Sequence, residues 1–450
     1  MKIKLIAGCA MLSMLTAQLP GCSFSTSVES MLSPPRLTVE QEQIYRALQT
    51  SAVSQISLKY PKSGERLSAF IMEDFDGDGS DEAVVFYEVA RNAADENPLR
   101  ICLLDQNADG TWTAISHASA AGAEIDRVDL ERLGTNPRMN LIISYSMVDG
   151  AEHAAQVFHY ENKLVKSLEI PYSVMELRDL NEDGTMEMFV ASAAKNSQPA
   201  AADVYALNER GKYVLDELAL PETMTDVSRI TYGRLPVGTG NETLPSNYLD
   251  GMSGATSVRT VVLNYRENLT MLYADSADRI LNTDRAGGFQ TMDIDGDGEA
   301  EIPVNMAFYG YSKPDVLMTN WYVCRNGLLM RERSSYYSAQ DGFVFLMPKR
   351  WERIVTARQE NDEMVFYTFD PQAAAVGEGD AAEAAEPQMI EPLLRLAVVT
   401  DPVAADAMQS DGYLLLRQQD SRYYLGRIEQ GGKSLRLSPS ELLVSMRFLQ

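Results

Sequence analysis

The chain has 450 residues, and its 64 Asp and Glu residues outnumber its 39 Lys and Arg residues, giving a formal net charge of −25. This acidity excludes nucleic acid and anionic lipid surfaces as partners, because like charges repel. The 4 cysteines, two of them within the first 22 residues, do not form the framework of a disulfide-rich domain.

The N-terminus predicts export and a lipid anchor. Two lysines precede an apolar run that ends at Leu19 and is too short for a lasting membrane span. Leu19-Pro20-Gly21-Cys22 then resembles the bacterial lipobox. This resemblance implies that residues 1–21 are a signal peptide, that Cys22 is lipidated, and that 22–37 form a spacer on the extracytoplasmic side of a bacterial membrane. The alternative is an ordinary secreted protein that is cut at another residue.

A helix is expected next, within an N-terminal helix and lead-in of residues 38–64. Thr38-Val39-Glu40-Gln41 follows two prolines and has the pattern of a capping box. The predicted helix begins there, ends near Ser54 and packs on the first β-unit.

Three acidic loops of one design begin at Asp74, Asp179 and Asp293. Each has Asp or Asn at positions 1, 3 and 5, Gly at position 6 and Glu at position 9, and each leads into a predicted strand. Alternate residues of a tight turn aim their oxygens at one point, and Ca²⁺ takes six to eight oxygens. The loops are not EF-hands, because position 12 is Val85, Val190 and Val304 instead of a bidentate Glu.

The design predicts two to three structural Ca²⁺ ions, with the backbone carbonyl at position 7 as an additional ligand. The second loop has Asn at position 3 and therefore one carboxylate fewer. Acidic hairpin turns that hold no metal are the alternative. The expected ligands are Asp74, Asp76, Asp78, Ser80, Glu82; Asp179, Asn181, Asp183, Thr185, Glu187; and Asp293, Asp295, Asp297, Glu299, Glu301.

The loop positions indicate a repeat of roughly 50–59 residues over 65–340, which suits a four-stranded unit in a propeller or array. Two further units without ligands are expected near residues 129 and 231. Their apolar strands Leu141-Ile142-Ile143 and Val261-Val262-Leu263 are expected to correspond to Val84-Val85-Phe86 of the first unit.

Loops of the form Asp-x-Asp-x-Asp-Gly-x-x-Glu that enter a strand, repeated at this spacing behind a lipobox, resemble the FG-GAP/VCBS-type repeat lipoproteins of bacteria, which have integrin-like calcium loops. The resemblance covers about 65–340. It implies a β-propeller whose loops hold structural Ca²⁺. The expected fold is mainly β: a propeller-like repeat of about five four-stranded units, followed by a small α+β domain.

The C-terminal α+β domain is expected over 341–450. Apolar segments predict its strands, and residues 371–388, rich in Ala, Glu and Gly, predict a disordered insertion. Ser438, Pro439 and Glu441 predict the start of a closing helix. Cys102 and Cys324 lie in apolar strand segments and are expected to be buried.

No catalytic residue is predicted. The chain has 3 His, and no zinc-binding spacing or glycine-rich phosphate loop occurs in the sequence. The favoured function is a non-enzymatic binding or adhesion module for an unknown protein or glycan. An envelope polysaccharide hydrolase or lyase is the alternative, and two facing carboxylates in a deep cleft would favour it.

Overall fold

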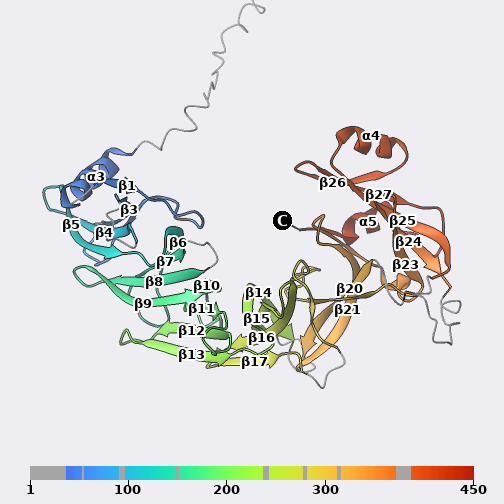
Figure 1. Cartoon of the computed structure of the whole chain (residues 1–450), viewed down its shortest axis with the longest axis horizontal. Helices are drawn as coiled ribbons and strands as arrows, with labels where there is room; N and C mark the ends of the chain where they lie inside the picture. The colour runs from blue at the N-terminus through green and yellow to red at the C-terminus, as the bar shows by residue number, and fades with distance from the viewer. Residues whose placement is uncertain are drawn as a thin grey trace, which may run out of the picture.

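The computed structural model describes residues 37–449, except 53–54, 91–96, 148–151, 237–242, 277–280, 312–315 and 371–386. Over these residues the chain forms six antiparallel sheets of four or five strands. Figure 1 shows the sheets following one another along an open arc, from the N-terminal sheet in blue to the C-terminal sheet in red. The predicted mainly β, propeller-like class of about five units with a small α+β region is confirmed, and the described sheets form an arc instead of a closed ring.

The second and third sheets pair consecutive strands and are meanders, whereas the first departs from this order. The first contains β1 (Ile56–Leu58), β2 (Phe70–Glu73), β3 (Glu82–Val89), β4 (Leu99–Gln106) and β5 (Trp112–Ser119). In this sheet β1 and β2 both pair with β3, and the meander continues through β4 and β5. The second contains β6 (Glu124–Glu131), β7 (Asn140–Ser146), β8 (His153–Tyr160) and β9 (Leu164–Tyr172). The third contains β10 (Val174–Arg178), β11 (Glu187–Ser192), β12 (Ala201–Leu207) and β13 (Tyr213–Ala219).

The last three sheets each have five strands, and the C-terminal strand β28 (Met446–Phe448) joins the fifth. The fourth contains β14 (Asp226–Pro236), β15 (Thr243–Met252), β16 (Ser257–Tyr265), β17 (Leu269–Tyr273) and β18 (Arg285–Ala286). The fifth contains β19 (Ile302–Ala307), β20 (Leu317–Arg325), β21 (Leu328–Ser338), β22 (Phe343–Leu346) and β28 (Met446–Phe448). The sixth contains β23 (Val355–Glu360), β24 (Glu363–Phe369), β25 (Met389–Val399), β26 (Leu414–Gln419) and β27 (Arg422–Ile428).

Alternate residues of each central strand pack on the two neighbouring layers, which explains the nearly continuous apolar strands. In β3, Val84 and Phe86 pack toward the second sheet, whereas Val85 and Tyr87 pack toward helix α3 (Val39–Ser51). Such a strand is buried on both faces, and each fully buried apolar side chain contributes about 1.5–3 kcal/mol. A single sheet therefore cannot stand alone, and the stack of neighbours is the stable unit.

Helices cover both ends of the arc. Helix α3 begins at the predicted capping box of Thr38 and Gln41 and packs on the first sheet through Ile44 and Leu48, as predicted. At the other end, helix α4 (Pro402–Ser410) places Ala405 on the sixth sheet. These helices cover the terminal apolar faces that a closed ring would pair with each other, which explains how the arc stays open.

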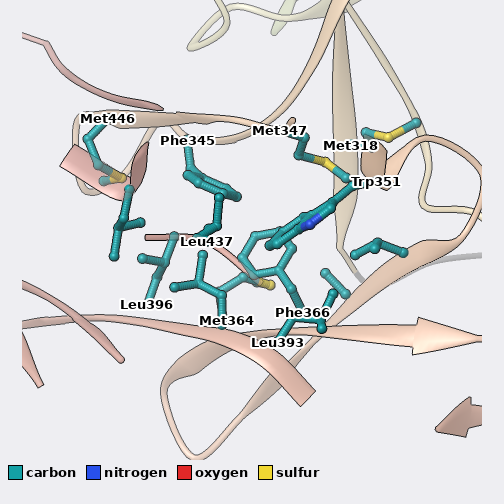
Figure 2. Packing of buried hydrophobic residues seen from close by; sticks show 14 of the residues in the cluster. Met318, Phe345, Met347, Trp351, Met364, Phe366, Leu393, Leu396, Leu437 and Met446 are labelled. Atoms are coloured by element: carbon teal, nitrogen blue, oxygen red, sulfur yellow. The ribbon is translucent and has the colours of Figure 1, made fainter. Parts of the chain in front are cut away.

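The largest core lies between the fifth and sixth sheets. Figure 2 shows Phe345 and Met318 of the fifth sheet in this cluster with Phe366 and Leu393 of the sixth. Trp351, in the 3₁₀ helix η1 (Lys349–Trp351), packs among them and donates its indole N–H to the backbone of the C-terminal segment.

The expected start of the C-terminal domain, residue 341, falls between β21 and β22, which pair in one sheet. The predicted closing helix is α5 (Pro439–Ser445), and its Ser438 and Glu441 form the capping box. The predicted insertion at 371–388 lies outside the described residues except for 387–388.

The two units predicted without ligands are present as the second and fourth sheets. Leu141–Ile143 lies in β7, which follows the first strand of its sheet, as Val84–Phe86 does in β3. The corresponding expectation for Val261–Leu263 was wrong, because this segment lies in β16, one strand later. The true equivalent is β15, whose buried positions include Ser246, Asn247 and Asp250, so its sequence lacks the apolar pattern of a core strand.

Candidate metal sites

The three acidic loops precede the strands β3, β11 and β19 and share one backbone geometry. Residues 4 and 6 of each loop have positive φ, between 60° and 91°. Gly occupies these positions except in the second loop, where Glu182 adopts φ 60°, an uncommon conformation for a residue with a side chain. The Asp at position 1 accepts a hydrogen bond from the backbone N–H of residue 6 at 3.1, 2.9 and 2.9 Å. Hydrogen bonds within each loop therefore hold the turn in the absence of an ion.

The Glu at position 9 lies under each loop and is buried. Glu82, Glu187 and Glu301 are exposed by only 1%, 2% and 0%. One carboxylate oxygen of each accepts a hydrogen bond from the backbone N–H of residue 2, at 2.8, 2.9 and 2.9 Å. This bond fixes the orientation of the carboxylate. Its other oxygen, Oε1, needs a second partner.

That second oxygen distinguishes the second loop from the other two. In the second loop, the hydroxyl of Thr185 lies 3.1 Å from Oε1 of Glu187 and 2.7 Å from Asp183, so its one proton is shared between the two carboxylates. In the first and third loops, Oε1 of Glu82 and of Glu301 is buried and has no hydrogen-bond partner among the described residues. Such a buried oxygen costs about 1–3 kcal/mol, and more when it is charged, so a missing partner is expected at these two positions.

The same carboxyls have raised pKa values. Burial raises the pKa of Glu82 and Glu187 to about 7 and that of Glu301 to about 8. Neighbouring loop aspartates raise all three further, and the hydrogen bond from the backbone N–H of residue 2 opposes the shift. The three carboxylates therefore lie in an environment that favours protonation unless a cation is present.

Two groups of oxygens have the size of a calcium site. The ligand atoms of Asp74, Asp76 and Asp78 lie within 4.8 Å of one another. Those of a second group, Asp295, Asp297, Glu301 and Glu332, lie within the same limit. Two oxygens on opposite sides of one Ca²⁺ are about 4.6–5.2 Å apart, so both groups fit a single ion.

Glu332 in the second group was missed by sequence reasoning. It lies on β21, outside the acidic loop, and is brought there by the pairing of β20 with β21. No local spacing in the sequence predicts this ligand. The sequence Arg331-Glu332-Arg333 by itself indicates only an exposed, charged strand face.

The second loop satisfies its polar groups with protein atoms. Asn181 donates to Asp183 at 2.9 Å, and the hydroxyl of Thr185 donates to Asp183 at 2.7 Å. Arg234 of the fourth sheet pairs with Glu182. Among the described residues, no group of metal-ligating side chains of the required size is found in this loop.

The remaining predicted ligands are at the loop surface. Asp179 and Asp293 accept backbone hydrogen bonds within their loops. The backbone N–H of Ser80 and of Glu299 is held by the Asp at position 5, at 2.8 Å in both loops. This hydrogen bonding fixes the turn, and ligation by the carbonyl at position 7 stays a prediction.

The loops of the ligand-free units dock against the acidic loops. The backbone N–H of Gly134 donates to the carbonyl of Met186 at 2.7 Å, next to the second loop's Glu187. The backbone N–H of Arg234 donates to Gly298 in the third loop at 2.8 Å. Gly134 has φ 58°, and a Cβ there would meet Leu207 O at 2.4 Å, so this contact requires glycine. The acidic loops are thus part of the contacts between sheets.

Outside the loops, Cys102 and Cys324 are buried free thiols, as predicted. The predicted signal peptide and Cys22 lie outside the described residues. Within the described part of the chain, no helix has the length and apolar character needed to cross a membrane.

Comparisons with known proteins identify no family. The sequence matches no protein-family model and no curated protein. Among solved structures, the chain is similar to a fructofuranosidase from Schwanniomyces occidentalis complexed with fructosylnystose, with 8% identity and a TM-score of 0.24. The match covers 62% of this chain and 56% of that one, so this protein spans little more than half of the neighbour's length. A likeness at this TM-score transfers neither geometry nor activity.

Proposed function

We propose that this chain is a calcium-stabilised β-repeat lipoprotein of the bacterial cell envelope that acts as a non-enzymatic binding or adhesion module. The observation that carries the calcium assignment is the pair of buried, unpartnered oxygens on Glu82 and Glu301. Each lies beneath a loop that offers further carboxylates. A divalent cation would offset the negative charge of both loops. At the third loop it would also provide the missing partner, because Glu301 belongs to the ligand group there. At the first loop, Glu82 lies outside the group of Asp74, Asp76 and Asp78.

Calcium fits these loops better than other common metals. The donors are carboxylates, without thiol or imidazole, which favours a hard cation. The loops are partly exposed to solvent, and extracellular calcium modules bind Ca²⁺ with a Kd of about 10⁻⁴–10⁻³ M. Such affinity suits the extracytoplasmic location that the lipobox predicts. The contrast with the second loop supports two ions in place of three.

A binding role is favoured over hydrolysis by the pairing of the carboxylates in a pocket of about 530 Å³ that is lined by the fifth sheet, η1 and α5. Asp295 pairs with Arg333 at 2.5 Å, Glu332 with Arg325 at 3.3 Å, and Glu352 with Arg331. The fourth lining carboxylate, Glu441, pairs with Arg350 at 2.8 Å. All four lining carboxylates are thus engaged by arginines of the protein, which favours a binding role over glycoside hydrolysis.

The calcium assignment is tested by thermal unfolding of the soluble region from residue 23 onward, in about 2 mM Ca²⁺ and in EDTA. Binding to the folded state alone raises stability in proportion to RT ln(1 + [L]/Kd), so the calcium curve should lie at higher temperature. Calorimetric titration should give a stoichiometry of two Ca²⁺ ions per chain. Identical unfolding curves would reject the assignment, and release of reducing sugar from envelope polysaccharide would reject the non-enzymatic role.

A further inference from the structure

A pocket of about 530 Å³ lies beside the third acidic loop and is lined by β21, β22 and β28 of the fifth sheet, by η1 and by α5. Its volume is within the range of about 300–1,000 Å³ that small-molecule sites occupy. Asp295 and Glu332 line this pocket, and both also belong to the group of carboxylates of the third metal site. A cation in that site would therefore lie at the pocket wall.

The pocket contains cationic side chains in two different states. Arg331 and Arg333 are neutralised by carboxylates of the protein, Glu352 and Asp295. Lys349 and Arg447 line the same pocket, and neither has a carboxylate partner among the described residues. Arg447 donates instead to backbone carbonyls, including that of residue 294 in the third loop at 3.0 Å. Two positive charges are therefore left to attract an anion, in a chain whose net charge is −25.

The metal site faces this pocket with an incomplete set of ligands. Asp295 is nine-tenths buried, and its Oδ2 contacts Arg333 while its Oδ1 is buried without a hydrogen-bond partner. Glu301 is fully buried and also has a free oxygen. The four carboxylates supply four ligand atoms, whereas Ca²⁺ takes six to eight oxygens. The remaining coordination positions are available to the backbone, to water and to a ligand in the pocket.

We propose that this pocket binds a saccharide that carries a carboxylate, such as a uronic acid, and that the carboxylate is shared by the third-loop cation, Lys349 and Arg447. The proposal rests on the calcium assignment made above. Without the cation, Asp295 and Glu332 are held by Arg333 and Arg325, and this wall of the pocket offers no positive charge of its own to the ligand. With the cation bound, the local charge becomes more positive by two, and the anion is attracted.

The lining favours a sugar over a peptide. Ser334, Ser440, Ser445 and Tyr309 also line this pocket. Ser334 donates to Asn320 and Tyr309 accepts from Arg331, and a hydroxyl oxygen engaged in one hydrogen bond keeps capacity for another, to the hydroxyl of a sugar. An extended peptide commonly binds by adding a strand to a free sheet edge. The wall strands β21 and β22 are each paired on both sides, and the edge strand β28 has only three residues, too few to hold an extended peptide by strand pairing alone.

The test is calorimetric titration of digalacturonate into the soluble region from residue 23, in about 2 mM Ca²⁺ and in EDTA. We expect binding in Ca²⁺ and at least tenfold weaker binding in EDTA or with the neutral methyl ester. Lys349→Gln should weaken binding about tenfold, because one charge-assisted hydrogen bond is lost. The matched control Lys163→Gln, on the exposed turn between β8 and β9, should leave binding unchanged.

Thermal unfolding of the same samples separates the two proposals. If Ca²⁺ raises the unfolding temperature but digalacturonate does not bind, the calcium assignment stands and the saccharide site is rejected. Equal affinity for the acid and its methyl ester also rejects the saccharide site, and so does an acidic peptide that displaces digalacturonate and binds more tightly. If Ca²⁺ leaves unfolding unchanged, the calcium assignment itself fails.

Discussion

Replacing Glu301 by Gln tests the metal hypothesis, because the hypothesis predicts higher stability without calcium, whereas the loss of a contact alone would lower stability. The Glu301 carboxyl is fully buried, and burial raises its pKa from 4.5 to about 8. At pH 7.5 the calcium-free fold keeps this group largely protonated, and protonating a carboxyl about three units above its ordinary pKa costs about 4 kcal/mol. Gln avoids this cost, keeps the acceptor for the backbone N–H of Ile294 and places an amide N–H₂ where the unpartnered oxygen lies.

We therefore expect the Glu301→Gln variant to be more stable than the wild type in EDTA, by about 1–4 kcal/mol. In Ca²⁺ the advantage should shrink. For a Kd of about 10⁻⁴–10⁻³ M, about 2 mM Ca²⁺ stabilises each intact site by about 0.6–1.8 kcal/mol. The variant loses this increment at the third loop and keeps it at the first.

The assay is urea unfolding at pH 7.5 over a series of Ca²⁺ concentrations. The dependence of the free energy of unfolding on the logarithm of Ca²⁺ concentration should fall from two ions in the wild type to one in the variant. Glu187→Gln is the matched control, because its carboxyl is equally buried but Thr185 already satisfies its second oxygen. This control should leave the calcium dependence unchanged. A Glu301→Gln variant that is less stable than the wild type in EDTA, or that keeps two ions, would refute the reasoning.

Four further outcomes are expected. The pKa values of the three buried glutamates are raised to about 7 or 8, so the calcium-free fold binds more protons than the unfolded chain above pH 5. Its free energy of unfolding should therefore fall between pH 5 and pH 8, by up to about 1.4 kcal/mol per pH unit for each group. Urea titration in EDTA measures this fall. Asp76→Ala should lower calorimetric calcium affinity, whereas Asp81→Ala, at an exposed position outside the ligand group, should not. Leu48→Ala should destabilise the fold by about 2–5 kcal/mol in chemical denaturation, because Leu48 of α3 is fully buried against the first sheet. Cys22→Ala should release the protein from the membrane fraction, and an unmodified mature N-terminus at another residue, found by mass spectrometry, would contradict lipidation.

Features set by neighbouring residues were predictable from sequence. The capping boxes of Thr38 and Ser438 are formed as expected, because the partners lie three residues apart and act within one turn. The acidic loops are also local, since each Asp binds backbone N–H groups only a few residues away. The repeat spacing then located the sheets, because each unit must be covered by the next.

Features that depend on distant residues were not predictable in this way. Glu332 joins the third site only because β20 and β21 pair. The strand β15 was missed because Asp250 is buried in a network with Arg285, at 2.7 Å, instead of in an apolar core. Two further features depend on packing between distant segments and have no local pattern in the sequence. They are the number of sheets in the array and the packing of α4 on the sixth sheet.

The three acidic loops differ in one contact at the buried glutamate and not in their place along the arc. The second loop lies between two ligand-free units, and both reach it: Gly134 binds the carbonyl of Met186, and Arg234 pairs with Glu182. The third loop is also reached by a neighbour, because the backbone N–H of Arg234 donates to Gly298. Contacts between neighbouring units therefore do not decide which loop keeps an unpartnered glutamate oxygen. The difference lies at position 7, where only the second loop has a Thr whose hydroxyl reaches Oε1 of the buried Glu.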